Sequence, residues 1–314
     1  MKPTSLLAVA GVTMAIAATP VLAQELSVES CETVSSFDGV PSRVVTLNQQ
    51  ATEIMLALGL EDHLVGTAYL DDAIPARWQA AYDSVTVLSE RYPAREVVLA
   101  KNPDLLFAGF NSAFGEKALG AQEAWNALGI GTYLVNVECR NLHPAAVKLT
   151  TAPLFIDLER IGALFEVEEK AAELAADIRL RLEAVAGANP GQGKRAFLYD
   201  SGSETAFSAG CCGAPGLLLD AVGLVNIAGD VEGRWADLAW EAVVAGNPEV
   251  IVLVDAEWST ADEKIAHLKD DPVLSTLEAV ENERFVVIPF SATVLGVRFV
   301  EGVEALGADL AALN

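Results

Sequence analysis

The chain of 314 residues has little positive charge and few histidines. Only 20 Lys and Arg residues oppose 44 Asp and Glu residues, so the formal net charge is −24. So acidic a surface repels the phosphates of nucleic acids and of anionic lipids, and neither is an expected partner. The three histidines, His63, His143 and His267, are scattered along the sequence. A site that coordinates a bare transition-metal ion through several histidine side chains is therefore not expected.

The sequence also lacks the common motifs of enzymes. GxSxG, HExxH and GxGxxG do not occur. Residues 187–194 come near a phosphate-binding loop, but the spacing is one residue too long and Arg195 replaces the usual Ser or Thr. No pair of carboxylates stands out as an acid/base couple. We therefore expect a protein that is not an enzyme, with no catalytic residue, no cofactor and no directly bound metal ion.

A long apolar run of the kind that spans a membrane is missing, and the N-terminus carries a shorter one. Leu6–Ala18 is uncharged, follows Lys2 and is too short for a stable anchor. Small residues follow at 21–23, which is typical of an export signal. We predict a signal peptide over residues 1–23, cleaved after Ala23. Because the cleavage point has no Cys for a lipid and the chain is acidic, a periplasmic location is favoured.

Cysteine is scarce, and four residues remain after the predicted cleavage: Cys31, Cys139, Cys211 and Cys212. In an oxidising compartment they are expected to pair, and three connectivities are possible. We favour Cys31–Cys139, because one precedes the first strand predicted in the N-terminal half and the other follows its last. Cys211 and Cys212 stay open between a vicinal disulfide, two thiols and a soft-metal site.

Short apolar runs alternate with helical patterns over most of the chain, and the chain is 52% hydrophobic, enough for a sizeable core. Strands are expected over 43–47, 64–68, 85–88, 105–108, 132–137, 196–199, 250–254 and 285–288. Helices are expected over 52–58, 75–81, 94–100, 116–128, 215–221, 240–245, 261–268 and 298–310. Such alternation predicts an α/β fold with mostly parallel sheets covered by helices.

The alternation is interrupted once. Residues 150–186 contain no strand pattern and keep apolar side chains at helical spacing. We therefore predict an N-terminal lobe over 24–149, a long connecting helix over 150–166 and a C-terminal lobe over 167–314. Two lobes joined in this way leave a cleft, which is a common place for a ligand.

Four segments carry a resemblance to a known family. Arg43–Gly59 (RVVTLNQQATEIMLALG) and Leu64–Tyr69 (LVGTAY) are similar to the opening strand, helix and second strand of the class III solute-binding proteins of ABC importers. Glu96–Leu106 (EVVLAKNPDLL) resembles that family's E-x-[IV]-x-A-L-x-P-D-L-[IV] segment, although Lys101-Asn102 departs from it. Trp240–Val252 (WEAVVAGNPEVIV) resembles the matching segment of the second lobe.

The resemblance implies a function. Members of this family carry iron–siderophore complexes, vitamin B12 or haem to a membrane permease and its ATPase. The expected ligand is thus an iron–siderophore or related metal chelate, with a corrinoid or haem as the alternative. We expect a monomer that does no chemistry itself. A competing hypothesis from another class is a secreted thiol-dependent enzyme that uses Cys211 and Cys212.

The resemblance also implies site residues. Glu96 and Glu241 match the two glutamates, one in each lobe, that dock against arginines of the permease. Ligand-binding residues are expected in the loops that follow the strands, because these loops face the cleft, and Tyr69, Phe207 and Trp235 match aromatic ligand contacts of relatives. The full expected set is Asn48, Gln49, Tyr69, Arg91, Tyr92, Phe110, Ser112, Tyr199, Phe207, Cys211, Cys212, Trp235, Ser291 and Arg298, with Arg234 as a further candidate to meet an anionic chelate.

Overall fold

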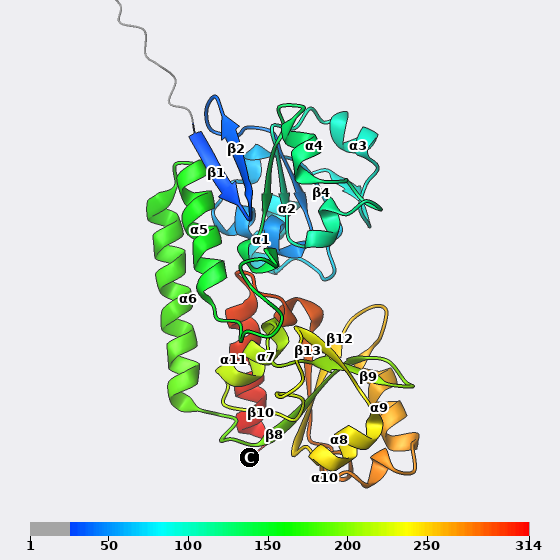
Figure 1. The fold of residues 1–314 in the computed structure, drawn as a ribbon. Coiled ribbons are helices and arrows are strands. Elements are labelled where there is room, and N and C mark those ends of the chain that lie inside the picture. Colours follow the sequence, from blue (N-terminus) through cyan, green and yellow to red (C-terminus); the bar gives the residue numbers. More distant parts are fainter. Residues whose placement is uncertain (1–25, 314) are drawn as a thin grey trace, which may run out of the picture.

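The computed structural model describes residues 26–313, and the predicted signal peptide lies outside this range. Two α/β lobes lie one above the other, and a pair of connecting helices lies on one side, the longer of which runs alongside both lobes (Figure 1). This arrangement confirms the two-lobed α/β fold expected from the sequence. Within residues 26–313, no helix combines the length and the apolar character needed to cross a membrane.

The N-terminal lobe contains a five-stranded parallel sheet. Its strands, in order across the sheet, are β5 (Val87–Ser89), β4 (Leu64–Ala68), β3 (Val44–Leu47), β6 (Leu105–Ala108) and β7 (Gly131–Leu134). Every residue of β3 and β6 is buried, because helices cover both faces of the sheet. The helices of this lobe are α1 (Gln49–Ala57), α2 (Ala76–Tyr82), α3 (Arg95–Leu99) and α4 (Gln122–Asn126), with short 3-10 turns η1 (Glu61–His63), η2 (Asn111–Phe114) and η3 (Asn136–Glu138).

A hairpin that the sequence did not predict precedes this sheet. Strands β1 (Leu26–Ser30) and β2 (Thr33–Phe37) pair antiparallel around a tight turn at Cys31, whose φ is 58°. The expected disulfide between Cys31 and Cys139 is present, with its Cα atoms 5.1 Å apart. It ties the hairpin to the segment that follows η3.

The C-terminal lobe contains a mixed sheet. Its strands, in order, are β11 (Trp235–Leu238), β9 (Ala206–Ala209), β8 (Arg195–Ser201), β12 (Val250–Asp255) and β13 (Phe285–Pro289), while β10 (Val225–Asn226) also pairs with β8. The three strands predicted from the sequence, β8, β12 and β13, are parallel. The antiparallel strands β9 and β11 were expected as loops, and that expectation was wrong. The helices are α7 (Ala214–Ala221), α8 (Trp240–Gly246), α9 (Ala261–Asp270), α10 (Glu278–Glu281) and α11 (Phe299–Ala312), with turns η4 (Leu274–Thr276) and η5 (Phe290–Thr293).

Several predicted elements of the N-terminal lobe are shorter than expected, two of them for a visible reason. The helix predicted over 116–128 forms only as α4, because a turn closes through the Gly120 amide to the Gly115 carbonyl and Gly120 has a φ of 76°. The strand predicted over 132–137 ends at Leu134, and the chain then enters the 3-10 turn η3.

The connecting region consists of two helices, α5 (Ala152–Leu164) and α6 (Glu168–Ala188). They pack closely where they meet, since a Cβ atom on Gly162 would lie 2.6 Å from the Cβ of Ala171. The longer helix α6 extends alongside both lobes (Figure 1). Arg181 of α6 forms a bidentate ion pair with Glu304 of α11, at 2.8 and 2.5 Å.

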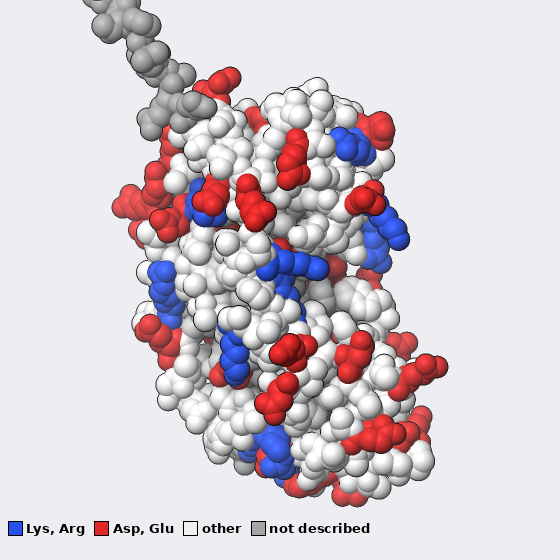
Figure 2. Space-filling view, viewed as in Figure 1, with Lys and Arg blue, Asp and Glu red and all other residues white. Residues whose placement is uncertain are grey.

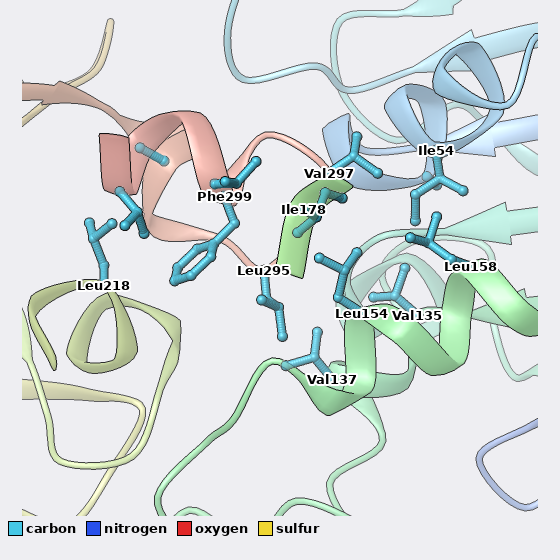
Figure 3. Packing of buried hydrophobic residues seen from close by; sticks show 14 of the residues in the cluster. Ile54, Val135, Val137, Leu154, Leu158, Ile178, Leu218, Leu295, Val297 and Phe299 are labelled. Carbon is cyan, nitrogen blue, oxygen red and sulfur yellow. The ribbon is translucent and has the colours of Figure 1, made fainter. Parts of the chain in front are cut away.

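One apolar core continues from one lobe into the other. Ile54 of α1, Leu158 of α5 and Ile178 of α6 belong to the same buried cluster as Leu218 of α7 and Phe299 of α11. Figure 3 shows these side chains converging from the connecting helices and both lobes. Because packed interiors resist continuous deformation, the shared core favours a fixed angle between the lobes.

Candidate functional site

A cleft lies between the lobes at the carboxyl ends of the strands, which is where open α/β sheets usually bind ligands. One cavity of about 520 Å³ is bounded by Tyr69–Asp71 and Ser89–Arg91 of the N-terminal lobe and by Trp258 of the C-terminal lobe. A second, of about 420 Å³, is bounded by Leu70–Ala73 and by Asp255–Glu257 across the cleft. The two cavities share Leu70, Asp71 and Glu257, so they form one continuous hollow.

Two loops that reach this edge of the N-terminal lobe hold unusual backbone angles. Asn48, directly after β3, has a φ of 75°, and Tyr69, directly after β4, has a φ of 58°. A residue other than glycine held at such an angle costs of the order of 1–3 kcal/mol, and such residues cluster at functional sites. The loops are fixed by hydrogen bonds: the Asn48 amide donates to the Ala68 carbonyl, and the Tyr69 amide donates to the Ser89 carbonyl.

Several of the predicted site residues form one hydrogen-bonded group on the N-terminal lobe. The Tyr92 hydroxyl lies 2.7 Å from Ser112 Oγ and accepts a hydrogen bond from Asn48 Nδ2 at 3.1 Å. Burial raises the pKa of Tyr92, so this hydroxyl stays protonated. The ring of Tyr92 meets that of Tyr69 edge to face at 4.8 Å, and Arg91 Nη1 donates to the Tyr69 hydroxyl at 2.9 Å.

Asn48 and Gln49 also fix the loops around this group. Asn48 is fully buried and its Oδ1 accepts the Phe110 amide at 3.2 Å, which fixes the loop after β6. Gln49 is also buried, and its Oε1 accepts the amides of Asp71 and Asp72. Gln49 therefore positions the loop that lines the hollow, and its own side chain is 1% exposed.

Aromatic residues of the C-terminal lobe lie on paired strands. Phe207 of β9 and Trp235 of β11 stack with their ring centroids 5.1 Å apart, and both are half-buried. Trp258, in the loop after β12, is 48% exposed and meets Phe290 edge to face at 5.0 Å. Sequence analysis missed Trp258, although an exposed Trp just after a buried strand was a signal that could have found it.

Three predicted residues of the C-terminal lobe are buried or paired. Tyr199 is 3% exposed, packs against Phe197 and Trp240, and donates its hydroxyl to the Gly202 carbonyl. The structure therefore does not bring Tyr199 to the lining of the hollow. Ser291 is buried, and its amide donates to Asp72 Oδ2 across the lobe boundary. Arg298 Nη1 donates to the buried Glu53 at 3.0 Å and to the Ala73 carbonyl at 3.2 Å.

The vicinal cysteines lie at another contact between the lobes. Cys211 and Cys212 are joined by a disulfide. Cys211 Sγ lies 3.9 Å from the carbonyl oxygen of Ala145, in the segment that leads to α5. Next to them, Arg234 pairs with Glu138 at 2.8 Å and donates to the Val137 carbonyl at 2.6 Å. Cys211 and Arg234 thus face a boundary between lobes.

The two glutamates expected to contact a permease occupy equivalent positions. Glu96 and Glu241 both lie in the first turn of a short helix, α3 and α8, where a carboxylate is favourable. Both side chains are exposed. Glu241 also lines a surface pocket of about 490 Å³ with Trp240, Val244 and Val273.

Carboxylates dominate the charge of the hollow. Burial, reinforced by the neighbouring Asp72, raises the pKa of Asp71 to about 6. Figure 2 shows acidic side chains spread over both lobes on the face that it presents, with fewer basic ones among them. Among the described residues, no group of three or more His, Cys, Asp or Glu side chains is arranged to hold a metal ion.

Two α/β lobes, a shared helical connector and a cleft lined from both sides are typical of the bilobal ligand-binding proteins. Comparison with known proteins agrees with this class. Residues 44–292 match the family described as periplasmic binding protein. The chain therefore belongs to this family, and the resemblance to the class III solute-binding proteins of ABC importers is confirmed.

Individual relatives extend this finding. The solved structure of a periplasmic binding protein from Veillonella parvula is similar with a TM-score of 0.80 and 29% identity, covering 92% of this chain and 98% of that one. An uncharacterised ABC transporter substrate-binding lipoprotein, YvrC of Bacillus subtilis, is 27% identical over 86% of this chain and 80% of its own. A cobalamin-binding protein of Halobacterium salinarum is 27% identical over 71% of this chain and 57% of its own length.

Proposed function

We propose that this protein is the substrate-binding component of an ABC importer, and that it captures a metal chelate in the cleft between its lobes. The observation that carries this proposal is a continuous hollow with aromatic side chains on both sides, Tyr69 from one lobe and Trp258 from the other. Flat aromatic faces bind bulky, partly apolar ligands with little loss of side-chain entropy. The protein then delivers its cargo unchanged to the permease and ATPase in the membrane.

The ligand class we propose is an iron–siderophore or a related metal chelate, with a corrinoid or haem as the alternative. The size of the hollow suits a ligand of this kind, since cavities of 420 and 520 Å³ adjoin each other and open to solvent. The relative that is named as cobalamin-binding supports the corrinoid alternative.

Release of the cargo is proposed to need only a small change of the angle between the lobes. Besides the shared core, ion pairs cross the boundary, Arg298 with Glu53 and Arg234 with Glu138. A hinge that opened widely would break both pairs and expose the core, at a cost of several kcal/mol.

We further propose that Glu96 and Glu241 contact basic residues of the permease, one on each lobe. Both are exposed at the start of a helix, and neither forms an ion pair within residues 26–313. The apolar walls of the pocket beside Glu241, from Trp240 and Val273, would add buried area to that contact. Transport of this kind also requires export, so we retain the predicted signal peptide and the periplasmic location as part of the proposal.

The thiol-dependent enzyme considered from the sequence gains no support. Cys211 Sγ is bonded to Cys212, and its other described contacts are the carbonyl oxygens of Ala145 and Gly233, which are not catalytic bases.

Calorimetric titration of the mature protein with ferric siderophores, haem and cobalamin tests the proposed ligand class. We expect one of these ligands to bind, and the double variant Tyr69→Ala/Trp258→Ala to weaken its binding at least about tenfold, because aromatic anchors dominate such sites. The control is Leu180→Ala, at an exposed position on α6. If no ligand of this panel binds, the proposed ligand class is wrong.

A further inference from the structure

The lining of the hollow carries a strong excess of negative charge. Glu90 and Glu257, one from each lobe, are exposed and form no hydrogen bond or ion pair in the part of the chain that the structure describes. Asp72 and Asp255 accept the backbone amides of Ser291 and Ala261, and Asp71 lies next to Asp72. The acidic residues of the lining are Asp71, Asp72, Glu90, Asp255 and Glu257, and the one basic residue is Arg91.

The other cations near the boundary between the lobes are already engaged. Arg298 is bound to Glu53, and Arg234 is bound to Glu138, so two of the three arginines expected to meet an anionic chelate are held by partners of their own. Lys264 is 2% exposed beneath the Trp258 loop, and its Nζ donates to the carbonyls of Val254 and Ser259 at 2.6 Å. None of these three side chains lines either cavity.

The aromatic side chains of the lining favour cations over anions, as the carboxylates do. The faces of Tyr69 and Trp258 carry the negative side of a ring quadrupole, which attracts a cation and repels an anion. The Arg91 guanidinium already lies 5.0 Å from the centre of the Tyr69 ring and donates to its hydroxyl. The single cation of the lining is therefore partly engaged within its own lobe.

We propose that this cleft selects neutral or cationic chelates and rejects anionic ones, such as ferric tricatecholates and ferric citrates. This inference rests on the proposed function and narrows its substrate class. An anionic chelate that enters a half-enclosed site loses part of its hydration and meets several like charges, which costs free energy. A neutral or cationic hydroxamate chelate, or a corrinoid of the same charge, avoids this cost.

Two ligand series that keep the scaffold and change the charge test the proposal. The first is a linear ferric trihydroxamate with a terminal ammonium group, compared with its N-acetyl form, which is neutral, and its N-succinyl form, which is anionic. The second is aquocobalamin, compared with neutral cyanocobalamin and with a cobalamin that carries a free carboxylate. Dissociation constants are measured by calorimetry at pH 7, above the raised pKa of Asp71 and low enough for aquocobalamin to keep its bound water and its positive charge, at low and at high salt.

Within the scaffold that binds, we expect the cationic form to bind at least about tenfold more tightly than the anionic form, and the difference to shrink at high salt. Glu90→Lys/Glu257→Lys should remove or reverse this preference. The matched control is Glu169→Lys/Glu173→Lys, which makes the same change of net charge on exposed positions of α6. This control should leave the ratio of the affinities within about threefold of the original, because its charges lie far from the cleft.

The outcomes separate this inference from the proposed function. If one scaffold binds and its anionic form binds as tightly as the cationic form, the charge selectivity is wrong while the proposed function stands. If both pairs of lysine substitutions changed the ratio of the affinities equally, the proposed charge selectivity would also be wrong, because the preference would then follow the net charge of the protein and not the charge of the cleft. If neither scaffold binds in any form, the proposed ligand class fails, and this inference fails with it.

Discussion

Arg298 and Glu53 form an ion pair across the boundary between the lobes, where their side chains are 16% and 3% exposed. Burial raises the pKa of Glu53, and the Arg298 charge opposes this effect. The pair therefore has a structural role, since each charge compensates the desolvation of the other. Removing one partner alone is expected to leave an uncompensated buried charge.

We predict that Arg298→Ala lowers the free energy of unfolding by about 3 kcal/mol at neutral pH. Adding Glu53→Gln to this variant should recover part of the loss, because no charge then stays buried without a partner. Urea denaturation of the single and double variants checks the prediction. A loss below about 1 kcal/mol in the single variant would show that water reaches the pair and screens it.

Asp157 of the connecting helix α5 is a second buried carboxylate, and it faces the N-terminal lobe. Its Oδ1 accepts the Tyr133 hydroxyl at 2.7 Å and the Asn136 amide at 2.8 Å. Burial nevertheless raises its pKa from 3.8 to about 7, since these two hydrogen bonds do not replace full hydration.

The raised pKa of Asp157 predicts how stability depends on pH. Between pH 4 and 7 the folded state holds a proton on Asp157 that the unfolded state has lost, so stability falls as the pH rises through this window and then levels off. By linkage the full effect is at most about 4 kcal/mol. In urea titrations at pH 5 and pH 8, Asp157→Asn should lose less stability than the wild type between the two values. Equal losses would mean that another group causes the pH dependence.

At the scale of elements, the β1–β2 hairpin depends on a covalent link. The hairpin forms a two-stranded sheet, and an isolated two-stranded hairpin is marginally stable in water. Ser30 Oγ accepts the Leu134 amide at 2.7 Å, which fixes the hairpin against β7. The disulfide between Cys31 and Cys139 closes a loop with a sequence separation of 108 residues.

We expect Cys31→Ser/Cys139→Ser to lower the free energy of unfolding by about 2–5 kcal/mol, because the unfolded chain regains the entropy of a long open loop. Thermal unfolding with and without a reductant provides the measurement. Reductant should lower the melting temperature of the wild type more than that of the variant, which keeps the disulfide between Cys211 and Cys212. A wild type insensitive to reductant under unfolding conditions would argue against the contribution of this bond.

The sequence predicted the parallel strands well and the antiparallel ones poorly. Strands β6 and β12 are short continuous apolar runs followed by turns, which is the pattern of a buried parallel strand. By contrast, β9 (AFSA) and β11 (WADL) have four residues each, and their pairing with each other and with β8 depends on contacts distant in sequence. Phe207 and Trp235 were therefore predicted as loop residues, whereas they stack on adjacent strands.

The same limit applies to the candidate site. Tyr69 and Arg91 follow predicted strands and line the hollow, because the position of a loop follows from the order of the elements; that they bind the ligand stays a prediction. The direction of a side chain does not follow from that order. Tyr199 belongs to a strand end as well, yet it points into the core with Phe197. The ion pairs of Arg234 and Arg298 likewise join residues more than 90 positions apart, and no local sequence pattern predicts them.

At the scale of the whole molecule, Glu96 and Glu241 occupy matching positions on two lobes whose angle is set by a common core. The binding of a partner that contacts both glutamates at once depends on the separation of the lobes. Two such contacts on one rigid body act together, since the second forms at a high effective concentration once the first has formed. The strength of docking should therefore depend on both residues more than either contact alone suggests.

We predict that Glu96→Ala/Glu241→Ala binds its cargo as tightly as the wild type but fails to support uptake in cells that depend on this importer. Both residues lie outside the hollow and on the surface, so cargo affinity and thermal stability should change little. Glu169→Ala/Glu173→Ala on α6 is the control, because it removes the same charge from exposed helix positions away from α3 and α8. Calorimetry measures cargo binding, and uptake of labelled cargo measures transport. Normal uptake by the Glu96/Glu241 variant would show that the permease recognises another surface, whereas equal loss with the α6 control would show that the net charge of the protein, and not these two positions, governs the encounter.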